Sequence, residues 1–388
     1  MSLKAQLDGL LGAAAANGDV PGVVAMATDR EGTFYEGAFG VRTAGESAPM
    51  TTDTVGLIAS MTKAITSVAV MQLVERGKLD LDAPAGKWQP HLAQVQVLEG
   101  YDAAGRPLLR APKTPVTVRH LLSHTSGFGY EFLNTETARY QAENKLAPIF
   151  HTDPATLRQP ILFDPGARWN YGIGIDWAGQ VLEAVTGQRL GAYLAENVLG
   201  PLGMHDTAFV ITPSMRARLA RVHARLADGT LVPAPLEVPQ PPGFDMGGGG
   251  LYATVGDYLK FIRMVLNGGN SPGGRILKSE TLEEMKRNQL GEMNVPSLKS
   301  IDKALTNDLV LPPEIPHKWG LAWLINTKPL PTGRPAGSLM WAGLTNCYYW
   351  IDPASGIGGV MLSQILPFAD VKAMPLYYAF EYTVYANR

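Results

Sequence analysis

The sequence predicts a mixed α+β fold in which both ends of the chain build one antiparallel sheet and a helical lobe is inserted between them. Strand-like segments lie near the N-terminus and again near the C-terminus, whereas residues 78–209 are rich in helices and loops. Apolar or amphipathic segments at the two ends predict helices that flank the sheet. We therefore expect two domains: residues 1–74 with 210–388 form the α/β domain, and residues 75–209 form the inserted helical domain.

The N-terminal part of the sheet is predicted from two neighbouring segments. Residues 23–29 (VVAMATD) and 33–42 (TFYEGAFGVR) have the composition of strands, and the residues between them that of a turn. A helix is predicted before them, because leucines recur on one helical face. These leucines are Leu3, Leu7, Leu10 and Leu11.

The segment after Ser60 predicts a helix in the middle of the fold. Apolar side chains wrap most of the circumference of residues 61–76, so this helix must pack on several sides. Gly77 is the predicted stop. The apolar residues are Ile65, Val68, Val70, Met71, Leu73 and Val74.

The rest of the chain alternates between these two patterns. Further strands are predicted at 320–326, 338–352 and 356–366, the last two joined by the turn sequence DPASG, before a closing helix at 375–388. Helices are expected in the middle region at 118–124, around 135–150, at 176–187 and at 190–200.

Composition excludes several function classes. The net charge is -2 and no segment concentrates Lys or Arg, so no nucleic-acid partner is expected. No run of eighteen apolar residues predicts a membrane span. The single cysteine, Cys347, fits a reducing compartment, and Asp8 interrupts the only stretch that resembles a signal peptide. We expect a soluble cytoplasmic protein that needs no cofactor or metal, with an undetermined oligomeric state.

Ser60 and Lys63 form the first candidate pair for catalysis. Residues three apart share a helix face, so both side chains project together if the helix starts near Ser60. Free N–H groups at a helix N-terminus stabilise developing negative charge, and burial favours the neutral lysine that accepts a serine proton. A capping serine and a solvated lysine are the alternative, which the tetrapeptide alone favours.

Two later segments supply partners for this pair. Tyr171, in the sequence WNYGI, would share a proton with Lys63 and donate it to a leaving group. Residues 341–344 (WAGL) lie in a predicted strand, whose edge can supply a second backbone N–H to an oxyanion hole. For each segment taken alone, a packed aromatic side chain is the favoured alternative.

Taken in order, five segments give the chain a resemblance to the serine β-lactamase/penicillin-binding-protein superfamily. It looks most like the family VIII carboxylesterases, relatives of class C β-lactamases. The resemblance spans nearly the whole chain and implies a β-lactamase/transpeptidase-like fold with the active site between two domains. The segments are SMTK at 60–63, LLSHTSG at 121–127, WNY at 169–171, PLGMHDTAF at 201–209 and WAG at 341–343.

The resemblance implies a role for each matching residue. Ser60 would be the acylated nucleophile and Lys63 its proton acceptor, while Tyr171 would act with Lys63 as base and then as acid. The backbone N–H groups of Ser60 and Leu344 would form the oxyanion hole. Trp341 replaces the lysine that starts the third motif of β-lactamases, so the contact to a drug carboxylate is lost.

Other departures also favour an ester over a carboxylate-bearing amide. Ile173 stands where the related enzymes carry an asparagine that contacts an amide side chain, and no export signal is evident. Substrate contacts are expected from Trp341 and Gly343, and from Phe128 and Tyr130 after the LLSHTSG turn. For these two aromatic residues, packing is the favoured alternative.

Two further motifs are set aside. Ser271 lies in a GxSxG pattern, but a helix precedes it and Pro272 removes the N–H that the elbow of α/β-hydrolases needs. His120 and His124 have metal-ligand spacing without a glutamate or an evident third ligand.

We therefore predict a serine carboxylesterase that hydrolyses short or medium acyl esters through an acyl-enzyme on Ser60. Ester cleavage needs less leaving-group protonation than amide cleavage does. The alternatives are a β-lactamase, a D-amino-acid peptidase-type amide hydrolase, an acyltransferase to a small alcohol, and a non-catalytic acyl-binding relative.

Overall fold

A seven-stranded sheet organises the computed structural model, which describes all residues from 1 to 388. The strand order is β11-β12-β13-β14-β15-β1-β2, and every neighbouring pair is antiparallel. Strands from both ends of the chain thus share one sheet, which confirms the predicted fold class. The strands are β1 (Gly22–Thr28), β2 (Thr33–Gly40), β11 (His317–Trp319), β12 (Leu324–Asn326), β13 (Leu339–Gly343), β14 (Cys347–Asp352) and β15 (Ile357–Leu362).

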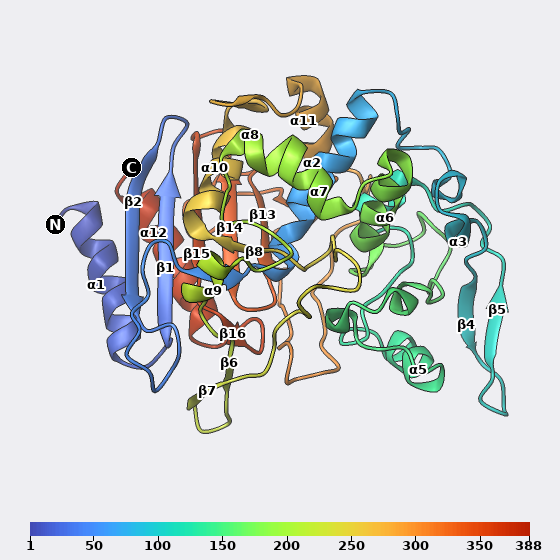
Figure 1. Ribbon diagram of the computed structural model, residues 1–388, viewed down its shortest axis with the longest axis horizontal. Coiled ribbons are helices and arrows are strands. Elements are labelled where there is room, and N and C mark those ends of the chain that lie inside the picture. The colour runs from blue at the N-terminus through green and yellow to red at the C-terminus, as the bar shows by residue number, and fades with distance from the viewer.

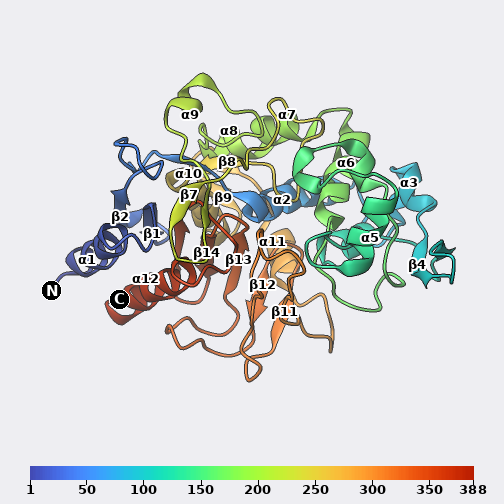
Figure 2. The same ribbon diagram turned by 90° about the horizontal axis from the view of Figure 1, so that it is seen from below.

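Two hydrophobic cores cover the two faces of this sheet. Side chains alternate between the faces, so that along β1 Val23 lies in one core and Val24 in the other. The smaller core is closed by α1 (Leu3–Ala16) and α12 (Ala373–Ala386), which pack together. Figures 1 and 2 show both termini at one end of the molecule.

The larger core is built around two helices. Helix α10 (Val255–Leu266) packs against β1, β14 and β15, while α2 (Thr62–Glu75) packs against α6 (Gly174–Thr186). Every residue of α2 from Thr62 to Leu73 is buried, as the apolar pattern predicted. Figure 1 shows α2 running between the sheet and α6.

Residues 75–209 contain several helices, long loops and a hairpin that the sequence did not predict. It consists of β4 (Val97–Tyr101) and β5 (Pro107–Arg110) and lies at the end of the molecule opposite the termini (Figure 1). The division into two domains at residues 74 and 209 stays a prediction. The helices here are α3 (Pro90–Ala93), α4 (Val118–Leu122), α5 (Thr135–Glu143), α6, α7 (Leu190–Leu194) and α8 (Gly200–Leu202).

Smaller elements complete the fold. Strands β3 and β8 pair beside the start of α2, and β16 pairs in parallel with β6. No helix combines the length and apolar character that a bilayer crossing requires. The elements are β3 (Val55–Leu57), β6 (His223–Arg225), β7 (Leu231–Pro233), β8 (Tyr252–Thr254), β9 (Asn270–Ser271), β10 (Gly274–Arg275), β16 (Ile365–Leu366), α9 (Pro213–Ala217) and α11 (Ser279–Lys286).

The prediction of a single strand over residues 338–352 is wrong. A turn at 344–346 divides it into β13 and β14, and Asn346 has a φ of 55°. Asparagine tolerates this left-handed conformation, and its side-chain amide donates to the carbonyls of Ile365 and Pro367, both at 2.8 Å. The apolar composition on both sides of the turn hid this reversal.

One cross-strand contact offers a test of the sheet's packing. Gly359 of β15 lies opposite Trp350 of β14, and a Cβ at position 359 would lie 2.2 Å from the buried indole ring. We expect Gly359→Ala to lower the free energy of unfolding by about 1–3 kcal/mol, because the indole must shift. Thermal unfolding measures this loss.

Gly9 provides the matched control. It is exposed in α1, and an added Cβ meets no atom within 4 Å, so Gly9→Ala should raise stability by about 1 kcal/mol. Equal melting temperatures for the two variants would contradict the packing described for Trp350.

Candidate active site

Ser60 lies in a short 3₁₀ turn, Ala59–Met61, that connects β3 to α2. The preceding residue, Ala59, is fully buried with a φ of 42°, a left-handed conformation that is strained for a residue with a Cβ. The backbone before it is fixed on both sides: the Ile58 N–H donates to Leu251 O, and the Thr345 hydroxyl donates to Leu57 O at 2.7 Å. This framework holds Ser60 in one orientation.

Lys63 is fully buried one turn further along and points back toward Ser60. Its Nζ lies 3.2 Å from Ser60 Oγ, 2.9 Å from the Tyr130 hydroxyl and 2.6 Å from the Gly248 carbonyl. Burial lowers the pKa of Lys63, and the negative charge of Asp176 opposes this by raising it. The net effect favours a neutral amine, which can accept the proton of Ser60.

Asp176 is a part of the site that sequence reasoning missed. It lies in the first turn of α6, is fully buried, and accepts the Gly248 N–H on Oδ1 at 2.8 Å. Because Gly248 O accepts from Lys63, a single residue connects the carboxylate to the lysine. Burial raises the pKa of Asp176, while the charge of Lys63 lowers it. An acidic residue on an otherwise apolar helix face, five residues after Tyr171, was the available signal.

The run Gly247–Gly250 allows this arrangement. A Cβ on Gly248 would lie 2.3 Å from Asp176 Oδ2. The backbone approaches Asp176 closely here, and the segment is a turn.

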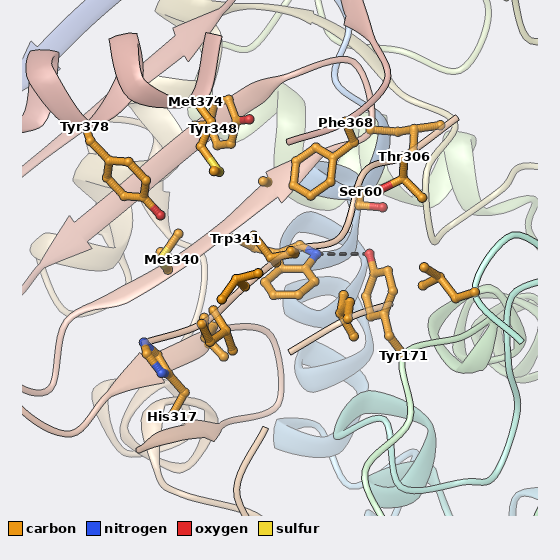
Figure 3. Close-up of a pocket in the computed structure, with 18 of the residues that line it drawn as sticks. Ser60, Tyr171, Thr306, His317, Met340, Trp341, Tyr348, Phe368, Met374 and Tyr378 are labelled. Atoms are coloured by element: carbon orange, nitrogen blue, oxygen red, sulfur yellow. Dashed lines mark hydrogen bonds between the residues drawn. The ribbon is translucent and has the colours of Figure 1, made fainter. Parts of the chain in front are cut away.

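Tyr171 is also buried beside this group, but it pairs with a different partner than expected. The indole Nε1 of Trp341 donates to its hydroxyl oxygen at 2.9 Å (Figure 3). Burial raises the pKa of Tyr171, while the neighbouring hydroxyl of Ser60 and the indole of Trp341 lower it. Lys63 Nζ lies 4.7 Å from the centre of the Tyr171 ring and makes its tyrosine hydrogen bond to Tyr130. Tyr130, predicted only as a pocket residue, is therefore the direct partner of the lysine.

The end of β13 lies against the turn that carries Ser60. A Cβ on Gly343 would lie only 2.3 Å from Ile58 O, so glycine is required for this contact. The following N–H, of Leu344, donates to no backbone or side-chain acceptor. Leu344 lines the cavity but Gly343 does not, and Gly343 lies against the turn before Ser60. The substrate contact expected of Gly343 stays a prediction. The oxyanion role of the Ser60 and Leu344 N–H groups stays a prediction.

A cavity of about 530 Å³ opens onto Ser60, and 23 of its 32 lining residues are hydrophobic. Ser60 and Tyr171 lie near one end, and Trp341 extends along it (Figure 3). Tyr130 lines it, in agreement with the prediction, but Phe128 does not. Phe128 is buried and stacks on Trp177 with ring centres 6.3 Å apart, so the structure places it in the core.

The motifs that the sequence set aside lie elsewhere in the structure. Ser271 Oγ donates to Gly274 O at 2.7 Å in a surface hairpin outside this cavity. His120 closes a capping box with Thr117 at the start of α4. His124 is buried against aromatic rings, including that of Trp319 at 5.0 Å.

The chain is similar to known proteins over nearly its whole length. The family described as Beta-lactamase matches residues 7–382. Monacolin J acid methylbutanoyltransferase of Aspergillus terreus is 33% identical over 385 residues, covering 95% of this chain and 92% of the relative. Lovastatin esterase of Penicillium rubens is 32% identical over 399 residues, covering 98% of each chain.

Solved structures give the same assignment. A mutant of simvastatin synthase (LovD) from Aspergillus terreus has a TM-score of 0.85 at 32% identity, covering 98% of this chain and 96% of that one. EstCE1, described as a hydrolase with promiscuous acyltransferase activity, shares the fold with a TM-score of 0.73 at 21% identity. The protein is thus an enzyme with the serine β-lactamase-like fold, and it belongs to the Beta-lactamase family; its relatives include an esterase and acyltransferases.

Proposed function

We propose that the protein cleaves carboxylic esters through an acyl-enzyme on Ser60. One observation carries this proposal: Lys63, buried and with a lowered pKa, contacts the hydroxyl of a serine that opens onto an apolar cavity. A buried neutral amine at this distance is the proton acceptor that an unactivated serine requires.

The residues take successive roles in acylation. Ser60 Oγ attacks the ester carbonyl carbon as its proton moves to Lys63 Nζ, and the N–H groups of Ser60 and Leu344 stabilise the oxyanion. Tyr171 accepts a hydrogen bond from Trp341, which leaves its own O–H free to point into the cavity. The proton of Tyr171 passes to the departing alkoxide as the C–O bond breaks. The ammonium of Lys63 then returns a proton to the Tyr171 oxygen.

Deacylation repeats these steps with a new nucleophile. Lys63 removes a proton from water, whose oxygen attacks the acyl carbon. As the bond between this carbon and Ser60 Oγ breaks, the Lys63 ammonium returns the proton to Ser60 Oγ. Asp176 and Tyr130 hold the lysine in place through Gly248 O and a direct hydrogen bond.

The lining of the cavity favours neutral, apolar esters. Trp341 contributes no positive charge beside Ser60, so a β-lactam carboxylate finds no ionic partner at that position. The similarity to lovastatin esterase supports the same class of reaction.

Acyl transfer to an alcohol is the second candidate. An alcohol competes well with water for the acyl-enzyme in a cavity lined mainly by hydrophobic side chains, and the similarity to a methylbutanoyltransferase favours it. The ratio of butyl butyrate to butyric acid formed from p-nitrophenyl butyrate with added butanol distinguishes the two outcomes.

Ser60→Ala tests the nucleophile. We expect kcat/KM for p-nitrophenyl butyrate to fall by at least about 10³-fold, because the attacking oxygen is lost. Ser271→Ala, which changes the serine of the GxSxG pattern, should retain the original rate. Mass spectrometry with a phosphonate inhibitor should show one adduct that disappears only in the Ser60 variant. Retained activity in Ser60→Ala would exclude the mechanism.

Two tyrosine variants test the division of roles. Tyr171→Phe should lower kcat by about 10²–10⁴-fold, because it removes the proposed general acid. Tyr130→Phe removes one hydrogen bond to Lys63 and should cost about tenfold. The difference between the losses in the two variants should become smaller for esters of acidic phenols, because these phenolates leave without being protonated. Equal losses with every leaving group would contradict the roles assigned to the two residues.

Asp176→Asn tests the electrostatics through pH. Acylation needs neutral Lys63, so kcat/KM should rise with pH through the lowered pKa of Lys63, below its ordinary value of 10.5. The negative charge of Asp176 raises that pKa. Its removal should therefore move the acid-side inflection to lower pH, while the asparagine Oδ1 still accepts the Gly248 N–H. An unchanged inflection, or one moved to higher pH, would contradict the coupling.

A further inference from the structure

The cavity extends well beyond the catalytic group to a second, more polar end. Figure 3 shows Ser60 and Tyr171 at one end and His317 and Tyr378 at the other, with Met340 between the latter two. The connection between β12 and β13 and helix α12 contribute to the wall here. Nothing in the proposed acylation chemistry uses these groups.

Arg334, from that connection, is a buried cation with unused hydrogen-bond donors in this wall. Its side chain is fully buried, and it lines the cavity. Its Nη2 donates to Met340 Sδ at 3.1 Å, a weak acceptor, while Nε and Nη1 have no hydrogen-bond partner. Buried guanidinium donors without acceptors are costly, so these need an explanation.

The neighbouring carboxylate of Glu381 does not explain these unpaired donors of Arg334. Glu381 Oε1 lies 3.3 Å from Arg334 Nε and balances its charge, but the two groups do not form the bidentate pair typical of arginine and carboxylate. The carboxylate instead accepts hydroxyls from Thr332 and, at 2.8 Å, from Tyr377. A purely structural ion pair would satisfy both partners, whereas here only the carboxylate is satisfied.

Two more groups make this end rich in donors. Tyr378, on α12 one turn before Glu381, has a hydroxyl that bonds to no protein group, and Figure 3 shows it directed toward Met340. His317 is buried, and burial together with the charge of Arg334 lowers its pKa, so its ring is neutral and adds no second cation.

We propose that Arg334 and Tyr378 form a remote subsite for an sp² oxygen of the substrate, a carbonyl or carboxylate separated by an apolar chain from the ester that Ser60 attacks. The planar guanidinium suits such an oxygen, and the hydrophobic lining before it suits the chain. This inference rests on the proposed ester chemistry and adds the class of substrate.

Substrate series on the unmodified enzyme test the subsite. The p-nitrophenyl esters of decanoic acid, of monomethyl sebacate and of sebacic acid have the same chain length and differ only at the far end. A second series, decyl acetate and the acetates of ω-hydroxydecanoic acid and its methyl ester, places the oxygen on the alcohol side. In at least one series, kcat/KM for an oxygen-ended ester should exceed that of the alkyl ester by about tenfold or more.

The results separate the two proposals. Preference for the alkyl esters in both series would overturn the subsite, provided p-nitrophenyl butyrate is cleaved. Failure to cleave the butyrate as well would instead overturn the ester chemistry. A higher kcat/KM for the methyl ester than for the free acid identifies a carbonyl as the natural group. The reverse order identifies a carboxylate.

Variants test whether Arg334 and Tyr378 cause the preference for oxygen-ended esters. The double substitution Arg334→Met with Glu381→Gln removes the donors without leaving a buried carboxylate unpaired, and should reduce the preference for oxygen-ended esters about tenfold. Tyr378→Phe should reduce it less. Tyr385 lies on the same helix as Tyr378, but its hydroxyl donates to Asp352 of β14, so Tyr385→Phe should leave the preference unchanged. A preference retained in both the double variant and Tyr378→Phe would overturn the assignment. If the double variant fails to fold, the substrate series and Tyr378→Phe decide.

Discussion

The burial of Lys63 is the constraint on which the rest of the site depends. A lysine amine inside a protein must be surrounded by acceptors and compensated in charge, and here Ser60, Tyr130, Gly248 and Asp176 meet these requirements. The same burial lowers the pKa of the amine, so that it is unprotonated and can accept the proton of Ser60. The environment that accommodates the lysine therefore also sets the protonation state that the proposed reaction needs.

The glycines of the site follow from this close packing. Gly248 lets a backbone segment pass between Asp176 and Lys63, and Gly343 lets the end of β13 approach the turn before Ser60. In both places a single methyl group would push apart elements that come from distant parts of the chain. The sheet and α2 thus determine how near the Leu344 N–H lies to the nucleophile.

The sequence was most informative where the relation between residues was local. Ser60 and Lys63 are three residues apart on a buried helix, and helical geometry alone brings them together. Tyr171 and Trp341 entered only through the order of several segments along the chain, which a resemblance could supply. The terminal strands were predictable because they are short apolar segments bounded by turn sequences, and the first helix because its leucines recur on one helical face.

The remaining features depend on tertiary packing, which leaves little trace in local patterns. Tyr130 and Phe128 are two residues apart in a loop, and nothing local determines which of them faces Lys63 and which packs on Trp177. Asp176 acts across a backbone segment more than seventy residues later in the chain. The turn at 344–346 was hidden because both strands that it joins are apolar.

The position of α12 has a consequence for how the molecule responds to occupancy. This helix is the last element of the chain, packs on α1, and supplies part of the wall of the distal cavity. A molecule that fills the cavity therefore contacts both α12 and strands of the sheet and stabilises their packing. Binding in the cavity therefore opposes local unfolding of the chain ends. A bound substrate slows hydrogen exchange in α12, although this helix is far from the reacting bond.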